Sequence, residues 1–185
     1  MNMPQQDGGD PRLLPIVIWP DPVLTVKAAP VETIDDKVRD LSEKMIYTLS
    51  VTSNGVGLAA PQVGVSLRMA AFDPSYDPDD IEGLADPDAL FMAINPEIVE
   101  EEGSYLDEEG CLSLPDLFYP VERPERVTMR YITLDGEPRT LVAHDFMAKL
   151  ICHEIDHLDG ILLWDRLSRF KREWLKGKFK KMRRR

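Results

Sequence analysis

The sequence feature that most constrains this chain is the segment His153-Glu154-Ile155-Asp156-His157. On an α-helix, residues four apart lie on the same face about one turn apart, so two imidazoles at this spacing can hold one metal ion. A glutamate directly after the first histidine can act as a general base on a water at that metal. A helix whose two histidines are only packed or solvated is the alternative. Asp159-Gly160 ends the helix that we expect over residues 144–158.

A catalytic metal held by two histidines needs a third protein ligand and one open position. The only other histidine, His144, lies nine residues before His153, and Leu163 stands where a third histidine ligand could follow the motif. Cys152 projects about 100° around the helix from His153, so we expect it to be a buried thiol and not a ligand. Cys111 follows a glycine and is a workable third ligand, although a core thiol is the alternative for this residue alone.

A third segment that could take part in catalysis is Gly55-Val56-Gly57-Leu58-Ala59-Ala60-Pro61-Gln62. Its two glycines and two alanines let another backbone approach closely, and the Gln62 side-chain amide could polarise a carbonyl oxygen. The composition alone also fits a tight loop after a helix. No Gly-Lys-Ser or Gly-Lys-Thr follows, so the segment is not a phosphate loop.

These three segments together resemble the peptide deformylase family. Its motifs GxGxAAxQ, EGCLS and HExDHL match residues 55–62, 109–113 and 153–158, in the family's order. The resemblance covers residues 16–164. It implies a hydrolase that removes the formyl group from the N-terminal formyl-methionine of nascent polypeptides and releases formate. It also implies an α+β fold with antiparallel β-sheets packed around a central helix that carries H-E-x-x-H.

The resemblance implies roles for individual residues. The metal ligands would be Cys111, His153 and His157, and the usual metal would be Fe²⁺, with Zn²⁺, Ni²⁺ or Co²⁺ as substitutes. Glu154 would take a proton from water and deliver it to the leaving amine. The Gln62 side chain and the Leu112 backbone N–H would hold the developing oxyanion. The substrate-binding residues, through backbone pairing or an apolar methionine pocket, would be Val56, Gly57, Gly110, Phe146 and Leu150.

Three further residues bear on this resemblance. Asp156 lies on the side of the helix away from the metal and is expected to form a structural ion pair with Arg123, an exposed and unpaired Asp156 being the alternative. The family commonly has glutamine at the position of Cys152, so we expect a modest change in local packing there. Residues 73–88, rich in Pro and Asp, are expected to form a surface insertion.

The remaining sequence predicts several strands and two more helices. Strands are expected at 65–72, 90–99, 127–134 and 140–142, with a hairpin turn at Asp135-Gly136 and a strand or extended segment at 16–19. Helical spacing after Thr33, the expected N-cap, involves Val38, Leu41, Met45 and Leu49 and ends at Asn54-Gly55. Strands and helices do not alternate regularly, which indicates an α+β fold.

The charge of the chain is unevenly distributed. Its net charge is −11, yet residues 169–185 carry ten Lys or Arg and one acid, which leaves −20 on the other 168 residues. Such a basic segment usually binds a polyanion. The alternative is a basic terminus that is only solvated. Phe170, Trp174 and Phe179 are spaced for an amphipathic helix within it. The family resemblance makes the ribosome the expected partner, with no membrane and no specific DNA.

Domain organisation and compartment follow from length and composition. We expect one domain over residues 1–185, with residues 1–11 a disordered tail and residues 166–185 a basic C-terminal helix. The start of the chain has no signal-peptide pattern, so the expected compartment is the cytoplasm. Two cysteines in such a chain argue against a disulfide scaffold. Three other functions fit parts of the sequence. They are a general H-E-x-x-H peptidase, a ribosome-associated binding protein on an enzyme fold, and a structural metal domain, which would require four protein ligands.

Overall fold

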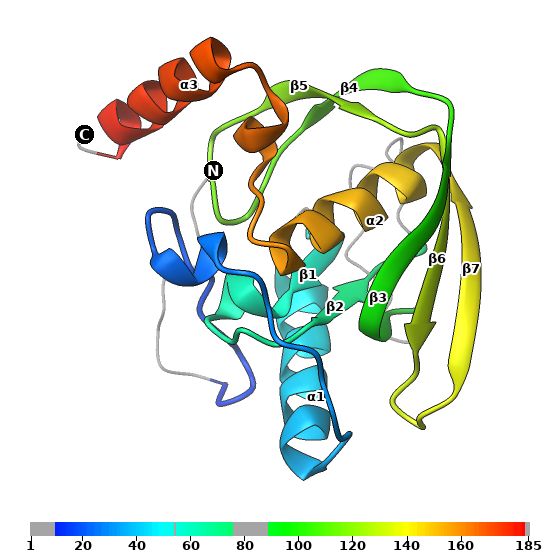
Figure 1. Cartoon of the computed structure of the whole chain (residues 1–185). Coiled ribbons are helices and arrows are strands. Elements are labelled where there is room, and N and C mark those ends of the chain that lie inside the picture. Colours follow the sequence, from blue (N-terminus) through cyan, green and yellow to red (C-terminus); the bar gives the residue numbers. More distant parts are fainter. Residues whose placement is uncertain (1–9, 54, 76–88, 184–185) are drawn as a thin grey trace.

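The protein is described by a computed structural model that covers residues 10–53, 55–75 and 89–183. These residues form three α-helices, which are α1 (Asp36–Val51), α2 (Asp145–Leu158) and α3 (Arg169–Met182) (Figure 1). Three short 3₁₀ helices are η1 (Pro22–Thr25), η2 (Ala60–Val63) and η3 (Leu163–Arg166). The strands are β1 (Gly57–Ala59), β2 (Met69–Phe72), β3 (Phe91–Glu102), β4 (Tyr105–Glu109), β5 (Tyr119–Arg123), β6 (Arg126–Ile132) and β7 (Pro138–His144).

Two antiparallel sheets enclose α2 (Figure 1). One sheet has five strands in the order β1-β2-β3-β6-β7, and the other is the hairpin β4–β5. Because successive side chains of a strand point to opposite faces, Ala70 and Phe72 of β2 pack toward α2, whereas Met69 and Ala71 belong to the core cluster of α1. The expected α+β fold with antiparallel sheets around the motif-bearing helix is therefore confirmed.

The predicted strands are confirmed in part. Strands β3, β6 and β7 match three predictions within a few residues, and Gly136 occupies the expected hairpin turn with φ of 83°. The strand predicted over 65–72 is shorter, because only the last four of these residues pair with β3. Residues 16–19 form no strand but an extended segment, in which Val17 N–H donates to the Gln62 carbonyl (2.7 Å).

Strands β1, β4 and β5 were not predicted from the sequence. Strand β1 has the sequence Gly-Leu-Ala, which has low β-propensity, and its three residues are all buried. Strand β4 is rich in acids, and β5 contains Pro120, which is tolerated because β5 pairs on one side only within the described residues. In these strands pairing follows from tertiary context and not from local preference.

Helix α1 begins two residues later than predicted. Its N-cap is Asp35 and not Thr33, because the Asp35 carboxylate accepts hydrogen bonds from the backbone N–H groups of Lys37 (3.1 Å) and Val38 (3.0 Å). The helix also ends at Val51, before the predicted Asn54-Gly55 stop, and Gly55 N–H donates to the Thr52 carbonyl in the turn that follows. These corrections leave the predicted buried face intact, with Val38, Met45 and Leu49 in the core.

The observed cap of α1 gives a direct test. Replacing Asp35 with alanine is expected to lower the free energy of unfolding by about 1 kcal/mol, because two helical N–H groups lose their acceptor. Thr33→Ala is the matched control, since Thr33 is exposed and lies outside the helix. Urea titration followed by circular dichroism measures both variants, and equal losses for the two would contradict this assignment.

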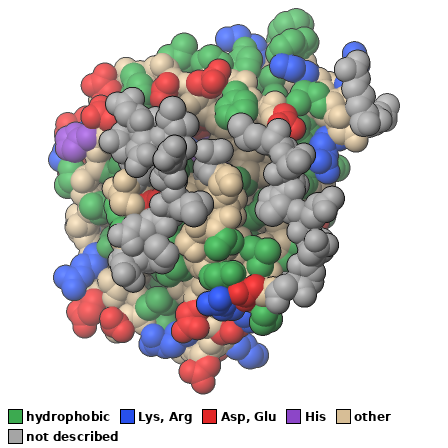
Figure 2. Space-filling model, turned by 180° about the vertical axis from the view of Figure 1, so that it is seen from behind, with side chains coloured by type: hydrophobic (Ala, Val, Ile, Leu, Met, Phe, Trp, Pro, Cys, Tyr) green, Lys and Arg blue, Asp and Glu red, His purple; other side chains and the backbone are tan. Residues whose placement is uncertain are grey.

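The predicted amphipathic helix of the basic segment is present as α3. Leu175 and Phe179 are buried, and Phe179 contacts Trp19 and Trp164 at centroid distances of 6.1 and 5.9 Å. Of the three aromatic residues whose spacing indicated the helix, Phe170 and Trp174 are 82% and 54% exposed, so only Phe179 packs on the protein. Figure 2, in which α3 lies toward the upper right, shows hydrophobic and basic side chains side by side at that end.

The structure describes only part of the predicted N-terminal tail and of the predicted insertion. Of the predicted tail, only the last two residues are described, and the Asp10 carboxylate accepts hydrogen bonds from Arg12. Of the predicted insertion, residues 76–88 lie outside the described residues, and its first residue, Asp73, is buried and not on the surface. Within the described part of the chain, no helix is long and apolar enough to cross a membrane.

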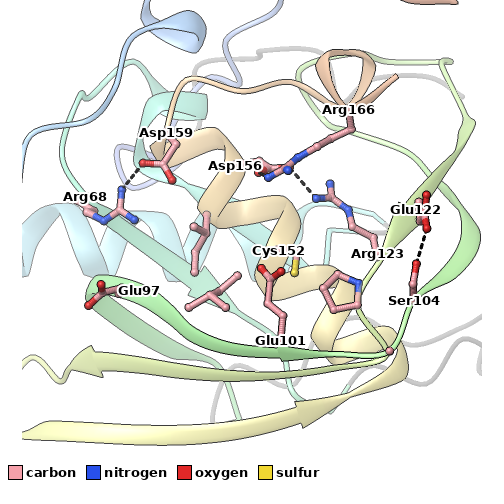
Figure 3. A pocket seen from close by; sticks show the side chains of 14 residues that line it. Arg68, Glu97, Glu101, Ser104, Glu122, Arg123, Cys152, Asp156, Asp159 and Arg166 are labelled. Carbon is pink, nitrogen blue, oxygen red and sulfur yellow. Dashed lines mark hydrogen bonds and ion pairs between the residues drawn. The ribbon is translucent and has the colours of Figure 1, made fainter. Parts of the chain in front are cut away.

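The hairpin β4–β5 is fastened to α2 through buried charges. Arg123 of β5 donates hydrogen bonds to Asp156 of α2 (2.7 Å), and Arg166 of η3 donates to the same carboxylate (2.9 Å) (Figure 3). The predicted pairing of Asp156 with Arg123 is thereby confirmed. These residues line a polar pocket of about 440 Å³ on the side of α2 that carries Cys152 and Asp159.

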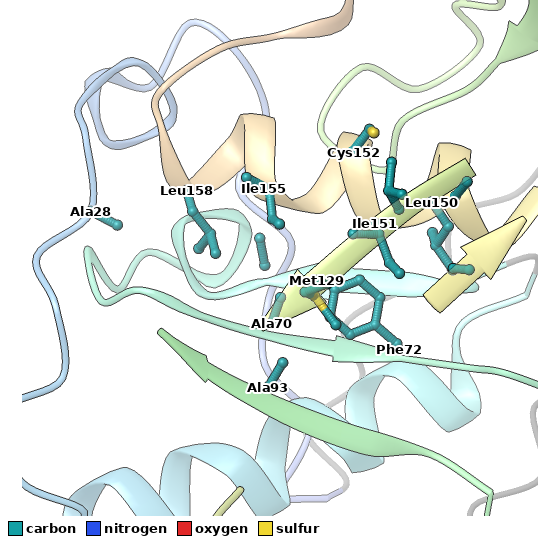
Figure 4. Packing of buried hydrophobic residues seen from close by; sticks show 14 residues of the cluster. Ala28, Ala70, Phe72, Ala93, Met129, Leu150, Ile151, Cys152, Ile155 and Leu158 are labelled. Carbon is teal, nitrogen blue, oxygen red and sulfur yellow. The ribbon is translucent and has the colours of Figure 1, made fainter. Parts of the chain in front are cut away.

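The apolar side of α2 packs on the five-stranded sheet. Ile151 points toward Phe72 and Met129, and all three side chains are fully buried (Figure 4). Alanines at 70 and 93 keep the sheet surface low, so the helix approaches closely (Figure 4). Burial of one such side chain contributes roughly 1.5–3 kcal/mol. The helix is therefore held rigidly by its surroundings, as a catalytic site requires.

Candidate metal centre and active site

Helix α2 places both motif histidines in the interior. His153, Glu154 and His157 are 8%, 2% and 1% exposed, because the helix runs between the two sheets. Cys111 lies just after β4, and its Sγ is 3.2 Å from Nε2 of His157. One ligand atom from each of Cys111, His153 and His157 falls within 4.8 Å of the others. The structure thus brings together the three residues expected to bind a metal.

The chemistry of this cluster fits a divalent metal. Thiolate and imidazole together suit iron or zinc, and three protein ligands leave a coordination position for substrate or water. Burial lowers the pKa of His157, which keeps its imidazole neutral and able to ligate. His144, the third histidine, caps α2 from an exposed position and is not part of the cluster.

Glu109 orients the first histidine, a role that the sequence analysis missed. Its Oε2 lies 2.9 Å from Nδ1 of His153, which leaves the Nε2 nitrogen for the metal. Burial alone would raise the pKa of Glu109, but hydrogen bonds from His153 and Arg123 outweigh it and hold that pKa at about 2. The only signal in the sequence was its place two residues before Cys111.

Arg123 joins this carboxylate to the outer charges. It donates to Glu109 through Nε (2.6 Å) and Nη2 (3.0 Å) and to Asp156 through Nη1. All three side chains are at most 5% exposed. A continuous set of hydrogen bonds therefore runs from Arg166 at the surface, through Asp156, Arg123 and Glu109, to the ring of His153.

Glu154 has the properties of a proton carrier. Burial raises its pKa to about 7, so both protonation states are accessible near neutral pH. Its Oε2 is buried and has no hydrogen-bond partner among the described residues. A buried polar atom without a partner is costly, and such atoms mark sites where water or substrate binds. The carboxylate belongs to the same turn of α2 as the first histidine, as the motif predicted.

Gly57 leaves the space that Glu154 needs. A Cβ at residue 57 would lie 2.5 Å from Oε1 of Glu154 and 2.8 Å from Cδ1 of Leu150. Both distances are far below van der Waals contact, so a side chain there would displace the carboxylate. The glycine of the first motif is thus required by a close approach between β1 and α2.

We expect Gly57→Ala to lower the turnover of the enzyme by at least about tenfold, because misplacing a reacting group by 1 Å can cost roughly 10²-fold. The measurement is the rate of amide hydrolysis by metal-loaded protein. Gly177→Ala is the control, because no atom lies within 4 Å of that added Cβ and alanine favours the helical conformation. Equal activity of both variants would show that Glu154 tolerates displacement.

Gln62 is placed beside the cluster by the turn after β1. Its Oε1 accepts a hydrogen bond from Ala59 N–H (2.8 Å), which directs Nε2 toward Cys111 Sγ at 3.8 Å. Leu114 N–H donates to the Cys111 carbonyl (2.9 Å) and closes a turn that contains Leu112. Both residues expected to stabilise the oxyanion therefore flank the cysteine.

The expected substrate-binding residues fall into two groups. Val56, Phe146 and Leu150 belong to one hydrophobic cluster, and a Cβ added at Gly57 would lie 2.8 Å from Cδ1 of Leu150, so these four residues lie near one another. Gly110 directly precedes Cys111 after β4 and is exposed, and a Cβ added there would lie 2.6 Å from the Phe118 ring. Cys152 is buried away from the cluster, and burial raises its pKa to about 12, as expected for a core thiol.

Two histidines of α2 and Cys111 could hold a metal ion, and a buried carboxylate lies beside them, an arrangement typical of metal-dependent hydrolases. Comparison with known proteins identifies which one. Residues 13–173 match the family model for polypeptide deformylase. A peptide deformylase of Acidobacterium capsulatum is 41% identical over 170 residues, which is 92% of this chain and 95% of that protein. The chain therefore belongs to the polypeptide deformylase family.

Solved structures agree with this assignment. The crystal structure of a peptide deformylase from Legionella pneumophila has a TM-score of 0.79 and 37% identity, covering 93% of this chain and 96% of that one. A peptide deformylase from Acinetobacter baumannii, solved with Met-Ala-Ser bound, has a TM-score of 0.75 and 36% identity, covering 84% and 98%. These matches do not favour the rival readings as a general peptidase or a binding protein without activity.

Proposed function

We propose that the cluster of Cys111, His153 and His157 holds the metal for removal of the formyl group from N-terminal formyl-methionine, and that Glu154 carries the proton. The observation that supports this most is the buried carboxylate, with its pKa near 7, next to three ligand atoms within 4.8 Å. Belonging to the deformylase family supports the reaction and the metal dependence.

The proposed metal is Fe²⁺, with Zn²⁺, Ni²⁺ or Co²⁺ as substitutes. One thiolate and two imidazoles suit this group of metals, and a thiolate with an open position also predicts sensitivity to oxygen. When bound, the metal supplies Lewis-acid chemistry that polarises the formyl carbonyl and acidifies a water.

The residues of the chain then act in order. The Glu154 carboxylate accepts a proton from the attacking water as the new C–O bond forms. The Gln62 side-chain amide and the Leu112 N–H donate hydrogen bonds to the oxyanion. Protonated Glu154 returns the proton to the amine nitrogen as the C–N bond breaks, which gives formic acid and a free N-terminal amine on methionine. Formic acid then loses its proton to the amine or to solvent and leaves as formate.

The proposed substrate lies extended between two backbone edges. Backbone groups of Val56 and Gly110 pair with the substrate backbone next to Gly57, and Phe146 and Leu150 line the methionine pocket with Val56. The Acinetobacter relative, solved with Met-Ala-Ser bound, supports a peptide that begins with methionine as the occupant.

The proposed activity is tested with formyl-Met-Ala-Ser and protein prepared without oxygen in the presence of Fe²⁺. Formate release from this peptide is expected, together with no cleavage of its internal peptide bonds and no reaction of unformylated Met-Ala-Ser. Folded, metal-loaded protein that releases no formate would overturn the proposal. Cleavage of internal bonds would instead support the peptidase reading.

The ribosome is the proposed partner of α3. Helix α3 carries a strongly basic surface and two exposed aromatic side chains, Phe170 and Trp174, whereas the rest of the chain is acidic. This arrangement suits attraction to a polyanion, and a ribosome would bring the enzyme to nascent chains in the proposed compartment, the cytoplasm. Cosedimentation of the full chain with ribosomes at low salt is expected, and equal binding after removal of residues 169–185 would contradict it.

A further inference from the structure

Strand β4 and the turn after it run alongside α2 in a single register. Every second residue of the strand meets every fourth residue of the helix. Tyr105 Oη donates to the Asp145 carbonyl at 2.9 Å, and Lys149 Nζ donates to the Asp107 carboxylate. Glu109 then meets His153 at 2.9 Å, and Cys111 meets His157 at 3.2 Å. The four contacts form a ladder whose rungs are 105–145, 107–149, 109–153 and 111–157.

The two spacings match for a geometric reason. Two residues of an extended strand advance about 6.6 Å, and four residues of an α-helix advance about 6 Å. A strand that runs parallel to a helix can therefore keep the same contact through several turns. Two rungs of this ladder belong to the metal centre, whereas the first two contain no predicted ligand. The position of the ligand Cys111 relative to both histidines depends on the register that all four rungs share.

Side chains, and not strand pairing, fix this register. Among the described residues, β4 pairs only with β5, and this hairpin shares no strand with the five-stranded sheet. The Lys149 side chain is 10% exposed, and its Nζ also donates to the Glu108 carbonyl at 3.3 Å. Its ammonium group thus binds one side chain and one backbone atom of β4 directly before Glu109. The hydrogen bond from Lys149 also lowers the pKa of Asp107, which keeps that carboxylate charged.

We propose that Lys149 is a positioning residue that sets the register between Cys111 and the two histidines, and thereby how tightly the metal is held. The proposal rests on the proposed metal centre. The Lys149 ammonium group binds Asp107 and the Glu108 carbonyl and not the three ligands, so it acts on the metal centre through β4. It also lies over the Phe146 ring, with Nζ 4.9 Å from the ring centroid, so metal affinity and not turnover is the readout, and a replacement must keep the apolar stem.

The test compares Co²⁺ affinity and the thiolate-to-cobalt absorption band in the full chain, with a competing chelator. Lys149→Met keeps the apolar stem and removes the ammonium, and we expect about tenfold weaker affinity, at the low end of losses seen for groups that support metal ligands. Lys149→Arg should restore affinity to within about threefold, because a guanidinium can also donate to Asp107 and Glu108. Lys44→Met is the matched control, since Lys44 pairs with Asp40 on the exposed side of α1.

Asp107→Asn approaches the same rung from its exposed side and guards against misfolding of the lysine variant, because Asp107 is 47% exposed. Its loss of affinity should not add to that of Lys149→Met in the double variant. Unchanged affinity and an unchanged absorption band in folded Lys149→Met would overturn the positioning role. Wild-type protein that binds no Co²⁺ would overturn the metal centre itself, so the two failures are distinguishable.

Discussion

Glu154→Gln is expected to lower kcat for formate release by about 10³-fold, within the range of rate losses for general acid–base groups. Glutamine has nearly the same shape but can neither accept the proton of water nor return one to the leaving amine. The carboxylate is 2% exposed and its pKa is near 7, which suits transfer in both directions. The measurement is single-turnover formate release by protein loaded with Fe²⁺ without oxygen.

Metal content decides how this result is interpreted. Glu154 lies next to His153 but is not one of the three clustered ligands, so the variant should hold the same amount of metal as the wild type. Glu43→Gln, an exposed carboxylate on α1, is the control and should keep full activity. A Glu154→Gln variant with normal metal and more than a tenth of the wild-type kcat would exclude Glu154 as the proton carrier.

The parts of the site that follow from local geometry could be predicted from the sequence. Helical spacing alone places His153 and His157 on one face and turns Cys152 away from them, and the structure agrees on both points. The family resemblance supplied Cys111, forty-two residues earlier in the chain, which spacing alone left open. The sequence and the resemblance thus predicted which three residues cluster in the structure.

The supporting contacts could not be predicted, because they depend on pairing between distant segments. Glu109 meets His153 only because β4 lies along α2, and β4 itself was not predicted from its acidic sequence. Likewise, Phe170 and Trp174 fit an apolar helical face as well as Leu175 does. Only the cluster around Trp19 and Trp164 determines which face of α3 is buried. Patterns of hydrophobicity describe a helix without its neighbours.

Arg123→Met is expected to lower the free energy of unfolding by about 3–5 kcal/mol, the cost of leaving buried charges without a partner. Methionine fills much of the space of the arginine stem, so the loss comes mainly from the charges. Arg123 donates to both Glu109 and Asp156, and those carboxylates are 3% and 5% exposed. Among the described residues, Asp156 would keep Arg166, whereas Glu109 would keep only His153. The measurement is urea unfolding of metal-free protein, followed by circular dichroism.

Arg130→Met on β6 is the matched control for this loss. Arg130 is 63% exposed and its guanidinium lies 3.4 Å from Glu97, so its removal should cost about 0–1 kcal/mol, as for other surface ion pairs. Arg123→Lys should recover only part of the loss, because one ammonium cannot reproduce the two-sided contacts of the planar guanidinium. If Arg123→Met and Arg130→Met unfold at the same urea concentration, the hairpin β4–β5 must be held on α2 by packing and not by its buried charges.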